Sequence, residues 1–280
     1  MEEFVKRQII IVNDCAYVMS DLIPYLSKSY KIKFLTRSRN LFSKTLGLLF
    51  KVLSANGDLY HVNYALQDAY IVSKLKRRLD VLHVHGSDVR TTISTKWGWI
   101  VKDNLLQART VLFSTEDLAP IVHSIRPDAL YLPNPVDTSK FKLKNSYNKV
   151  PKALYFRLKY EEIPPVLPSL LYKYNIKLEI LDKNIPYDRM PELLSTYDIF
   201  IDRFTIGSFS KTCLESMSVG LATIDFRHLN DLEKRVKEIS DPNVIADIGR
   251  TNREFIVKHH EVRKIAERLS QIYQSLLATR

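Results

Sequence analysis

The feature of this 280-residue chain that most constrains its fold is a repeated alternation of short apolar runs with longer helical segments. In the first half the runs are RQIIIVN (7–13), KIKFLT (31–36), GDLYHVN (57–63), LDVLHVHG (79–86) and ARTVLFST (108–115). These runs favour β-strands, and the segments between them favour helices. Such alternation predicts a parallel sheet with helices on both faces.

A second series of the same kind fills the other half. It comprises ALYFRL (153–158), IKLEILD (176–182), YDIFIDRF (197–204) and LATIDF (221–226). A long amphipathic helical pattern follows from about Thr251. Between the two series, residues 130–152 hold three prolines, several polar residues and five lysines, which predicts an exposed linker.

We therefore expect an α/β chain with two doubly wound, Rossmann-like domains facing across a cleft. The length suits two domains, since single cores rarely grow beyond 250–300 residues. The expected boundaries are residues 1–145 for an N-terminal, acceptor-side domain and 146–255 for a C-terminal, nucleotide-sugar-binding domain. Residues 256–280 form a C-terminal helix expected to pack back toward the first domain. Ligands should bind at the carboxyl ends of the strands.

The composition excludes several classes of protein. No run of about 18 apolar residues could span a bilayer, and the N-terminal apolar run is too short for a signal peptide. The two cysteines, Cys15 and Cys213, form neither a disulfide framework nor a metal-ligand pattern. We expect a cytoplasmic protein without a bound metal or other cofactor.

The net charge of +11 is unevenly spread. Residues 1–145 carry 21 Lys and Arg against 13 Asp and Glu, whereas residues 146–280 carry 21 against 18. A basic half suits an anionic partner such as a phosphorylated molecule or a membrane surface, or it only aids solubility. No nucleic-acid-binding motif is present, so we expect no nucleic-acid partner.

Polar residues gather where predicted strands of the first domain end. In VLHVHGSDVR, Gly86 permits a sharp turn and His85 can donate to a ligand at neutral pH, whereas His83 is expected to be a core residue. Other strands end at His61 and Asn63, for which a helix cap or an ordinary loop is the alternative. The candidate acceptor residues are Asn13, Asp14, His61, Asn63, Gly86, Ser87, Asp88 and Arg90.

Two cations follow the first predicted strand of the second domain. Arg157 can hold a diphosphate with two hydrogen bonds, and Lys159 can act as a point charge. The alternative is surface charge beside a sheet. With His85, these two residues are the candidate catalytic set.

The stretch TIGSFSKTCLESMSVG predicts a turn followed by a helix. The first N–H groups of a helix lack intrahelical partners, which makes an anion site that Lys211 would strengthen. Glu215, one turn further on, can accept hydrogen bonds from the vicinal hydroxyls of a ribose. A plain helix with a chance glutamate is the alternative. The candidate nucleotide-sugar residues are Gly207, Ser208, Phe209, Ser210, Lys211, Thr212 and Glu215.

These motifs together resemble those of the retaining glycosyltransferases of the GT-B fold, family four (glycosyl transferases group 1). LHVHGSDVR resembles the family's strand-His-Gly element, and ALYLPNPVDTSKF is similar to its first-domain exit. YFRL resembles its phosphate-binding strand end, and the region 190–224 its donor site. The resemblance implies a metal-independent transfer that retains the anomeric configuration.

The chain departs from the family's pattern at three places. Gly207 stands where the family often has the first of two glutamates, and Glu215 matches the second, which the family uses for ribose. One subgroup of the family has glycine at this position and an aspartate on the preceding strand. Asp202 would match that aspartate. Glu162 stands where the family's lysine usually lies, so Lys159 is displaced by three residues. The glycine-rich loop after the first strand is replaced by NDCAYVMS.

The sequence thus predicts a glycosyltransferase that moves a sugar from a nucleotide-diphosphate sugar to a glycan or lipid-linked acceptor. The alternatives are a non-catalytic sugar-nucleotide-binding protein and a hydrolase or epimerase on the same fold. Residues 41–53 place Phe42, Leu46, Leu49, Phe50 and Leu53 on one helical stripe, with Lys44 and Lys51 beside it. That stripe either packs on the sheet or makes the protein a peripheral membrane protein.

Overall fold

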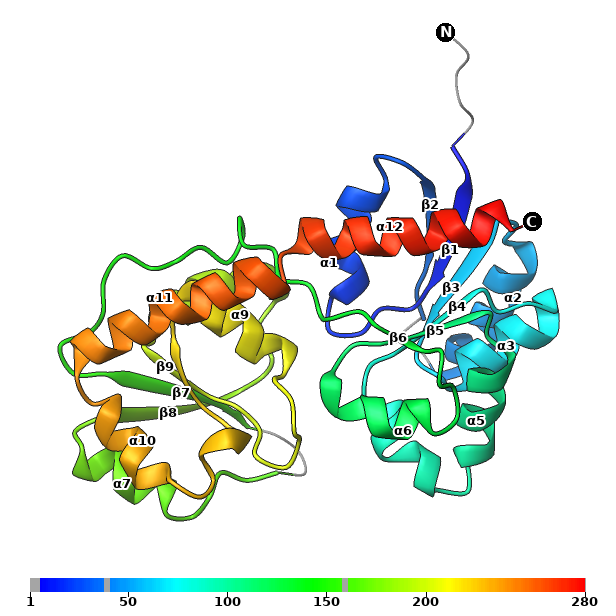
Figure 1. The fold of residues 1–280 in the computed structure, drawn as a ribbon. Helices are drawn as coiled ribbons and strands as arrows, with labels where there is room; N and C mark the ends of the chain where they lie inside the picture. Colours follow the sequence, from blue (N-terminus) through cyan, green and yellow to red (C-terminus); the bar gives the residue numbers. More distant parts are fainter. Residues whose placement is uncertain (1–5, 38–40, 158–160, 280) are drawn as a thin grey trace, which may run out of the picture. The chain divides into compact units, whose positions relative to one another are not determined.

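The computed structural model describes residues 6–37, 41–157 and 161–279, and the backbone alone of residues 41–45. Its contacts divide the chain into two compact units, each with its own sheet (Figure 1). Unit 1 comprises the residues up to Pro135 together with those from Val262 onward, and unit 2 comprises Val136–Glu261. The sequence placed the boundaries at 145/146 and 255/256, so the structure begins and ends unit 2 elsewhere.

Unit 1 contains a six-stranded parallel sheet in the order β2-β1-β3-β4-β5-β6. Its strands are β1 (Gln8–Val12), β2 (Lys31–Leu35), β3 (Leu59–Asn63), β4 (Val81–Val84), β5 (Thr110–Phe113) and β6 (Leu130–Tyr131). The chain reverses its direction of winding at β1, which lies between β2 and β3. Ligands of doubly wound sheets bind outside the carboxyl ends of strands at such a switch point.

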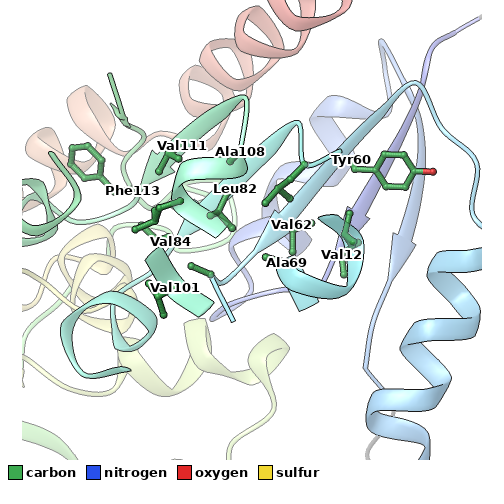
Figure 2. Close-up of a cluster of buried hydrophobic side chains, with 14 of the residues drawn as sticks. Val12, Tyr60, Val62, Ala69, Leu82, Val84, Val101, Ala108, Val111 and Phe113 are labelled. Atoms are coloured by element: carbon green, nitrogen blue, oxygen red, sulfur yellow. The ribbon is translucent and has the colours of Figure 1, made fainter. Parts of the chain in front are cut away.

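Helices cover both faces of this sheet. They are α1 (Val18–Leu26), α2 (Leu41–Ser54), α3 (Gln67–Lys76), α4 (Ser87–Arg90), α5 (Gly98–Gln107), α6 (Ala119–His123) and α12 (Val262–Ala278). Alternate strand residues point to opposite faces, which gives unit 1 two cores. Figure 2 shows part of the first, where Val62, Leu82 and Val84 meet residues of α3 and α5. The second core joins Ile9 and Ile11 to α1 and α12.

Unit 2 contains a four-stranded parallel sheet in the order β10-β9-β7-β8. The strands are β7 (Lys152–Arg157), β8 (Lys177–Asp182), β9 (Ile199–Ile201) and β10 (Ala222–Ile224). The helices are α7 (Leu167–Lys173), α8 (Met190–Ser195), α9 (Lys211–Val219), α10 (Leu232–Glu238) and α11 (Pro242–His259). Here the winding reverses at β7, which lies between β8 and β9.

The predicted parallel α/β architecture is confirmed, but the predicted exposed linker at 130–152 is wrong in part. Its first residues form β6, and the side chains of Val136 and Phe141 are fully buried. Both belong to the core that α9 forms with β7 and β9. These two apolar residues override the loop-forming composition around them, because burying a large apolar side chain contributes roughly 1.5–3 kcal/mol.

Candidate functional site

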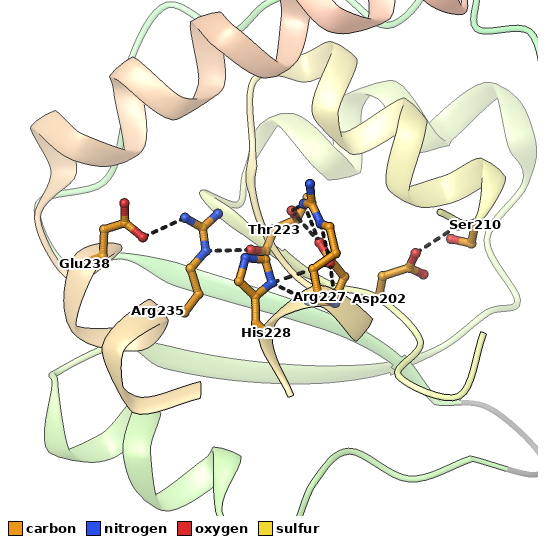
Figure 3. A network of polar contacts seen from close by, with 8 residues as sticks. Asp202, Ser210, Thr223, Arg227, His228, Arg235 and Glu238 are labelled. Atoms are coloured by element: carbon orange, nitrogen blue, oxygen red, sulfur yellow. Dashed lines mark hydrogen bonds and ion pairs between the residues drawn. The ribbon is translucent and has the colours of Figure 1, made fainter. Parts of the chain in front are cut away.

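The start of α9 is set by local capping. Ser210 is the N-cap, and its Oγ accepts the Cys213 N–H at 3.1 Å. Asp202, just beyond β9, accepts the Ser210 N–H at 2.8 Å (Figure 3). Asp202 is 3% exposed, and burial raises its pKa. The anion-binding helix terminus expected from the sequence therefore already has a carboxylate of the protein beside it.

Gly220 ends α9 in a left-handed conformation, with φ of 94°. A Cβ at this position would lie 2.5 Å from the Leu143 Cδ1 and 3.0 Å from the Tyr147 hydroxyl. Only glycine combines this backbone angle with that space. The turn fixes where β10 begins and so keeps α9 directly behind the carboxyl edge of the sheet.

Lys211 and Glu215, both predicted to contact the nucleotide, form a buried ion pair. The Lys211 Nζ lies 2.8 Å from the Glu215 Oε1, and the side chains are 6% and 2% exposed. The Tyr187 hydroxyl donates to the same oxygen at 2.8 Å and accepts from the Lys211 Nζ at 3.1 Å. In this structure the Lys211 charge is balanced by Glu215, so it is not directed toward the pocket beside α9.

That pocket, about 160 Å³ in volume, lies at the carboxyl edge of unit 2 beside the switch strand β7. Its polar lining includes Lys183, Asp202, Arg203, Ser210 and Thr212. Of these, the sequence analysis named Asp202, Ser210 and Thr212 but missed both cations.

Lys183 follows β8 directly, and its Nζ donates to the Thr212 Oγ1 at 2.7 Å. The residue as a whole is exposed, but its ammonium group is hydrogen-bonded to α9. Partial withdrawal from water lowers the pKa of Lys183; the charges of Arg203 and Lys211 act in the same direction, and those of Glu215 and Asp202 oppose it.

The other residues predicted to bind the nucleotide sugar have different environments. The Arg157 side chain is 66% exposed and lies 3.4 Å from Asp182, and Lys159 lies outside the described residues. Gly207 and Ser208 belong to the loop between β9 and α9. Phe209 packs on Phe226, with ring centroids 5.9 Å apart.

Asp225, after β10, anchors a polar network whose members Thr223, Arg227 and His228 are labelled in Figure 3. It accepts the Arg227 Nε at 2.8 Å and the Thr223 hydroxyl at 2.8 Å. Burial opposes ionisation of Asp225, but hydrogen bonds from His228 and Arg227 outweigh it and lower the pKa of the carboxyl. The Arg227 guanidinium in turn lies 4.6 Å from the centre of the Phe209 ring, so the network holds the loop before α9 in place.

In unit 1, the carboxyl edge at the switch strand borders an open groove of about 490 Å³. Its lining residues are Asn13, Asp14, Thr36, Arg37, Tyr64, Leu66, Asp68 and Ser87. Asn13, Asp14 and Ser87 are thus brought together as expected, whereas Arg37, Tyr64 and Asp68 were missed. Arg37 donates through Nε to Asp68 Oδ1 at 2.8 Å, which forms a charge pair in the wall of the groove.

The backbone at this edge adopts conformations that side chains rarely allow. Asn13 after β1 has φ of 61°, Tyr64 after β3 has φ of 74°, and Gly86 after β4 has φ of 139°. Non-glycine residues with a positive φ are held in that conformation by their surroundings, and they cluster at functional sites. Three adjacent strands leave the sheet in this way, which points to a binding edge.

Two further candidates, Asp88 and Arg90, hold the loop rather than line the groove. Asp88 is buried and accepts the N–H groups of Ala65, Gly86 and Val89 at 2.9–3.1 Å. The Arg90 guanidinium binds the Asp117 carboxylate and the Thr115 hydroxyl. A Cβ on Gly86 would lie 2.1 Å from the Arg90 Nη1, so glycine is required.

Three histidines lie in a row inside unit 1. The ring centroids of His61 and His83 are 5.7 Å apart, and those of His83 and His85 are 4.2 Å apart. The His61 Nδ1 lies 2.5 Å from the hydroxyl of Tyr273 on α12. Burial lowers the pKa of all three, to about 3 for His83, so they are uncharged at neutral pH.

His85, the predicted catalytic histidine, is committed to an internal contact. Asn63 donates through Nδ2 to the Asn13 carbonyl at 2.9 Å, which directs its Oδ1 toward the His85 Nε2 at 2.9 Å. The Nε2 must therefore carry the proton, and the buried Nδ1 has no hydrogen-bond partner among the described residues. The Nε2 of His85 can donate to a ligand only after its contact with Asn63 is broken.

Among the described residues, no three His, Cys, Asp or Glu side chains lie close enough together to hold a metal ion. Within the same residues, every helix is too short or too polar to cross a bilayer.

No protein-family model matches the chain, and no curated protein matches it significantly. Solved structures do match. Sucrose-phosphate synthase from Thermosynechococcus elongatus is 12% identical, with a TM-score of 0.70 over 98% of this chain and 100% of that one.

Two other structures superpose over similar lengths. For OtsA the identity is 9% and the TM-score 0.65, over 95% of this chain and 99% of that one. The catalytic domain of starch synthase IV from Arabidopsis thaliana, bound to ADP and acarbose, is 8% identical. Its TM-score is 0.61, over 98% of this chain and 99% of that one. The chain therefore has the GT-B fold of these glycosyltransferases.

Proposed function

We propose that the protein is a glycosyltransferase that moves a sugar from a nucleotide-diphosphate sugar to an acceptor hydroxyl. The observation that carries this proposal is the cationic pocket at the switch point of unit 2, in a chain with the GT-B fold. The anomeric carbon would exchange its bond to the diphosphate oxygen for a bond to the acceptor oxygen. The diphosphate leaves with the electron pair, and the acceptor proton passes to a base or to the diphosphate itself.

The donor would bind to unit 2. Arg157 and Lys159 are proposed to contact the diphosphate, with the N–H groups around Ser210 and Thr212. Tyr187 and Lys211 both donate to the Oε1 of Glu215, so we propose that Oε2 accepts a ribose hydroxyl. Because Glu215 is 2% exposed, this requires Tyr187 to move when the nucleotide binds.

The acceptor would bind to unit 1, in the groove bordered by Asn13 and Ser87. Amide and hydroxyl groups of this kind suit the hydroxyls of a glycan. His85 is proposed to contact the donor sugar or its phosphate. The transfer is proposed to retain the anomeric configuration and to need no metal, in keeping with the resemblance of the motifs.

One observation favours a second candidate, a non-catalytic protein that binds sugar nucleotides. Gly207 stands where the resembling family often has a glutamate, so a carboxylate expected near the sugar is absent. A donor-only assay for sugar release, followed by an assay with glycan acceptors, separates transfer, hydrolysis and binding. A thermal-shift panel of nucleotide sugars comes first, since a ligand at 100 times its Kd stabilises by about 2.7 kcal/mol. If no nucleotide sugar shifts Tm, all three activities are excluded.

We further propose a cytoplasmic enzyme that meets a lipid-linked acceptor at a membrane surface. On α2, Leu48 and Val52 pack into the core, whereas Leu46, Phe50 and Leu53 are 54%, 66% and 49% exposed. Lys51 is exposed beside this stripe, and the side chains of Phe42 and Lys44 lie outside the described residues.

An exposed apolar stripe with flanking lysines suits an anionic bilayer. Co-sedimentation with anionic liposomes tests it. Phe50→Ser with Lys51→Glu should abolish binding at low salt. If the wild-type protein stays in the supernatant at low salt, the acceptor is soluble.

A further inference from the structure

Two cations reach the unit 2 pocket from opposite sides of the switch strand. β7 lies between β8 and β9 in the sheet. Lys183 follows the last residue of β8, and Arg203 lies two residues beyond the end of β9. The parallel strands end at the same edge, so both side chains line the same small cavity beside β7.

Neither of these charges is balanced by an ion pair within the part of the chain that the structure describes. The Lys183 ammonium donates to the neutral hydroxyl of Thr212, at 2.7 Å. Arg203 is half-buried, and its guanidinium forms no hydrogen bond or ion pair with another described residue, although the neighbouring Asp202 carboxylate attracts it electrostatically. A guanidinium and an ammonium that share one cavity with a single carboxylate keep an excess positive charge that a bound anion would offset.

The other cations near the pocket differ in this respect. Lys211 is neutralised by Glu215 in a buried pair. Arg157 is two-thirds exposed and lies 3.4 Å from Asp182. Among the residues that the structure describes around this pocket, the charges available to a bound anion are therefore those of Lys183 and Arg203.

The carboxylate in the pocket lining offsets only one of the two charges. Asp202 is 3% exposed, accepts the backbone N–H of Ser210 and also interacts electrostatically with Lys183 and Arg203. With Lys183 and Arg203, the lining carries a net charge of about +1 when Asp202 is ionised. The hydroxyls of Ser210 and Thr212 add neutral hydrogen-bonding groups that suit phosphate oxygens.

We propose that Lys183 and Arg203 form the phosphate-binding pair of this protein and hold the diphosphate of the nucleotide ligand. The inference rests on the proposed function and adds to it two residues with no counterpart in the sequence motifs. Glu162 occupies the motif position where a lysine was expected, and Lys183 supplies that charge from the next strand of the sheet.

The test compares nucleotide binding by the full-length chain and by single variants. Isothermal titration measures Kd for UDP, ADP and GDP and for the matching nucleosides. Lys183→Met and Arg203→Met remove each charge but keep an unbranched stem. The control is Lys177→Met, an exposed lysine at the opposite end of β8. Circular dichroism melting verifies that each variant is folded.

We expect each of the two pocket variants to weaken binding of the preferred nucleoside diphosphate by about tenfold or more, since hydrogen bonds to charged groups are worth about 1.5–3 kcal/mol. Nucleoside binding should stay unchanged, and Lys177→Met should behave as wild type. Lys183→Arg should restore part of the affinity. A folded Lys183→Met or Arg203→Met protein with wild-type affinity for the diphosphate would overturn the assignment of that residue.

Failure of the inference is distinguishable from failure of the proposed function. If the wild-type protein binds a nucleoside diphosphate and the variants bind it equally well, the function stands and the phosphate pair falls. If the wild-type protein binds no nucleotide but binds inorganic pyrophosphate through these two residues, the pair stands and the proposed donor falls. If it binds neither, both are overturned.

Discussion

The two sheets switch direction at the same point of their topology, yet their carboxyl edges treat charge in opposite ways. In unit 1, Arg37 is paired with Asp68, and the imidazoles behind the edge are uncharged. In unit 2, Lys183 and Arg203 line the pocket with Asp202 as the one carboxylate of its described lining, so positive charge is in excess. The same framework thus offers one edge suited to neutral hydroxyls and another suited to an anion. Charge placement, rather than topology, distinguishes the two edges, and under the proposed function it would separate an acceptor side from a donor side.

The largest effect on stability is expected from a substitution that removes a buried side chain next to the uncharged histidines of unit 1. Tyr273→Ala removes a fully buried ring from the core formed by α1 and α12, and it leaves the His61 Nδ1 without its partner. We expect a loss of about 3–5 kcal/mol in the free energy of unfolding. Both tryptophans, Trp97 and Trp99, lie in unit 1, so urea unfolding followed by tryptophan fluorescence reports on this unit.

Gln274→Ala, an exposed neighbour on the same helix, serves as the matched control and should change stability little. Tyr273→Phe should lose about 1–3 kcal/mol, because the ring stays and the hydrogen bond is lost. A Tyr273→Ala protein as stable as wild type would show that α12 contributes nothing to this core.

The next effect concerns the buried ion pair of unit 2. Lys211→Met leaves the Glu215 carboxylate buried without its cation, and we expect a loss of about 3 kcal/mol in the free energy of unfolding. The double variant Lys211→Met, Glu215→Leu should be more stable than this single variant. Far-UV circular dichroism in urea, compared with tryptophan fluorescence, assigns the loss to unit 2. Equal stability of the single and double variants would mean that the two charges do not interact.

Acid should distinguish the units as well. His61, His83 and His85 have pKa values lowered by burial, so the unfolded chain binds protons that the folded chain cannot. Their contribution to the stability of unit 1 is present above about pH 6.5 and is lost as the pH falls below it. Each histidine adds a slope of about 1.4 kcal/mol per pH unit. The raised pKa of Asp88 acts in the opposite direction at lower pH.

Urea unfolding at pH 7.5, 6.5, 5.5 and 4.5, followed by tryptophan fluorescence, measures this slope. In unit 2 the lowered pKa of Asp225 stabilises above about pH 4 and the raised pKa of Asp202 opposes it, so little change is expected between pH 7.5 and 5.5. His83→Asn should flatten the slope for unit 1. A stability of unit 1 that is constant from pH 7.5 to 4.5 would contradict the buried, neutral histidine row.

The smallest effect on stability is expected at Arg157. Its ion pair with Asp182 is long and largely exposed, so Arg157→Ala should change the free energy of unfolding by about 0.5 kcal/mol or less. Turnover with the nucleotide sugar should nevertheless fall if this arginine meets the diphosphate. Wild-type turnover in the folded variant would leave Lys183 and Arg203 as the phosphate contacts and Arg157 as surface charge.

Local patterns in the sequence predict the framework well. The β-branched run at 7–13 contains β1, and the stretch predicted as a turn followed by a helix contains α9. These features depend on neighbouring residues, whose physics is local. The predicted grouping of Asn13, Asp14 and Ser87 also follows from strand ends that meet at one edge of a sheet.

Partners far apart in the sequence were not predictable from such patterns. Lys183 follows a strand in no recognisable motif, and its position against Thr212 depends on how β8 and α9 pack. The Tyr187 contact with Glu215 bridges 28 residues, and the Tyr273 contact with His61 bridges 212. Periodicity shows which side of a helix is apolar but does not show which ring will meet it.

The position of α12 has a consequence for biosynthesis. Unit 2 is one continuous segment, whereas unit 1 takes its last helix from residues made after unit 2. On the ribosome the chain for the first sheet emerges early, but its α1 face stays uncovered until Val262–Ala278 has been made. We therefore expect unit 2 to fold first, against the usual N-terminal-first order. Proteolysis of chains stalled after residue 261 should find unit 2 protected and unit 1 cleavable, so any interruption of translation before α12 would release a chain with an exposed apolar sheet face.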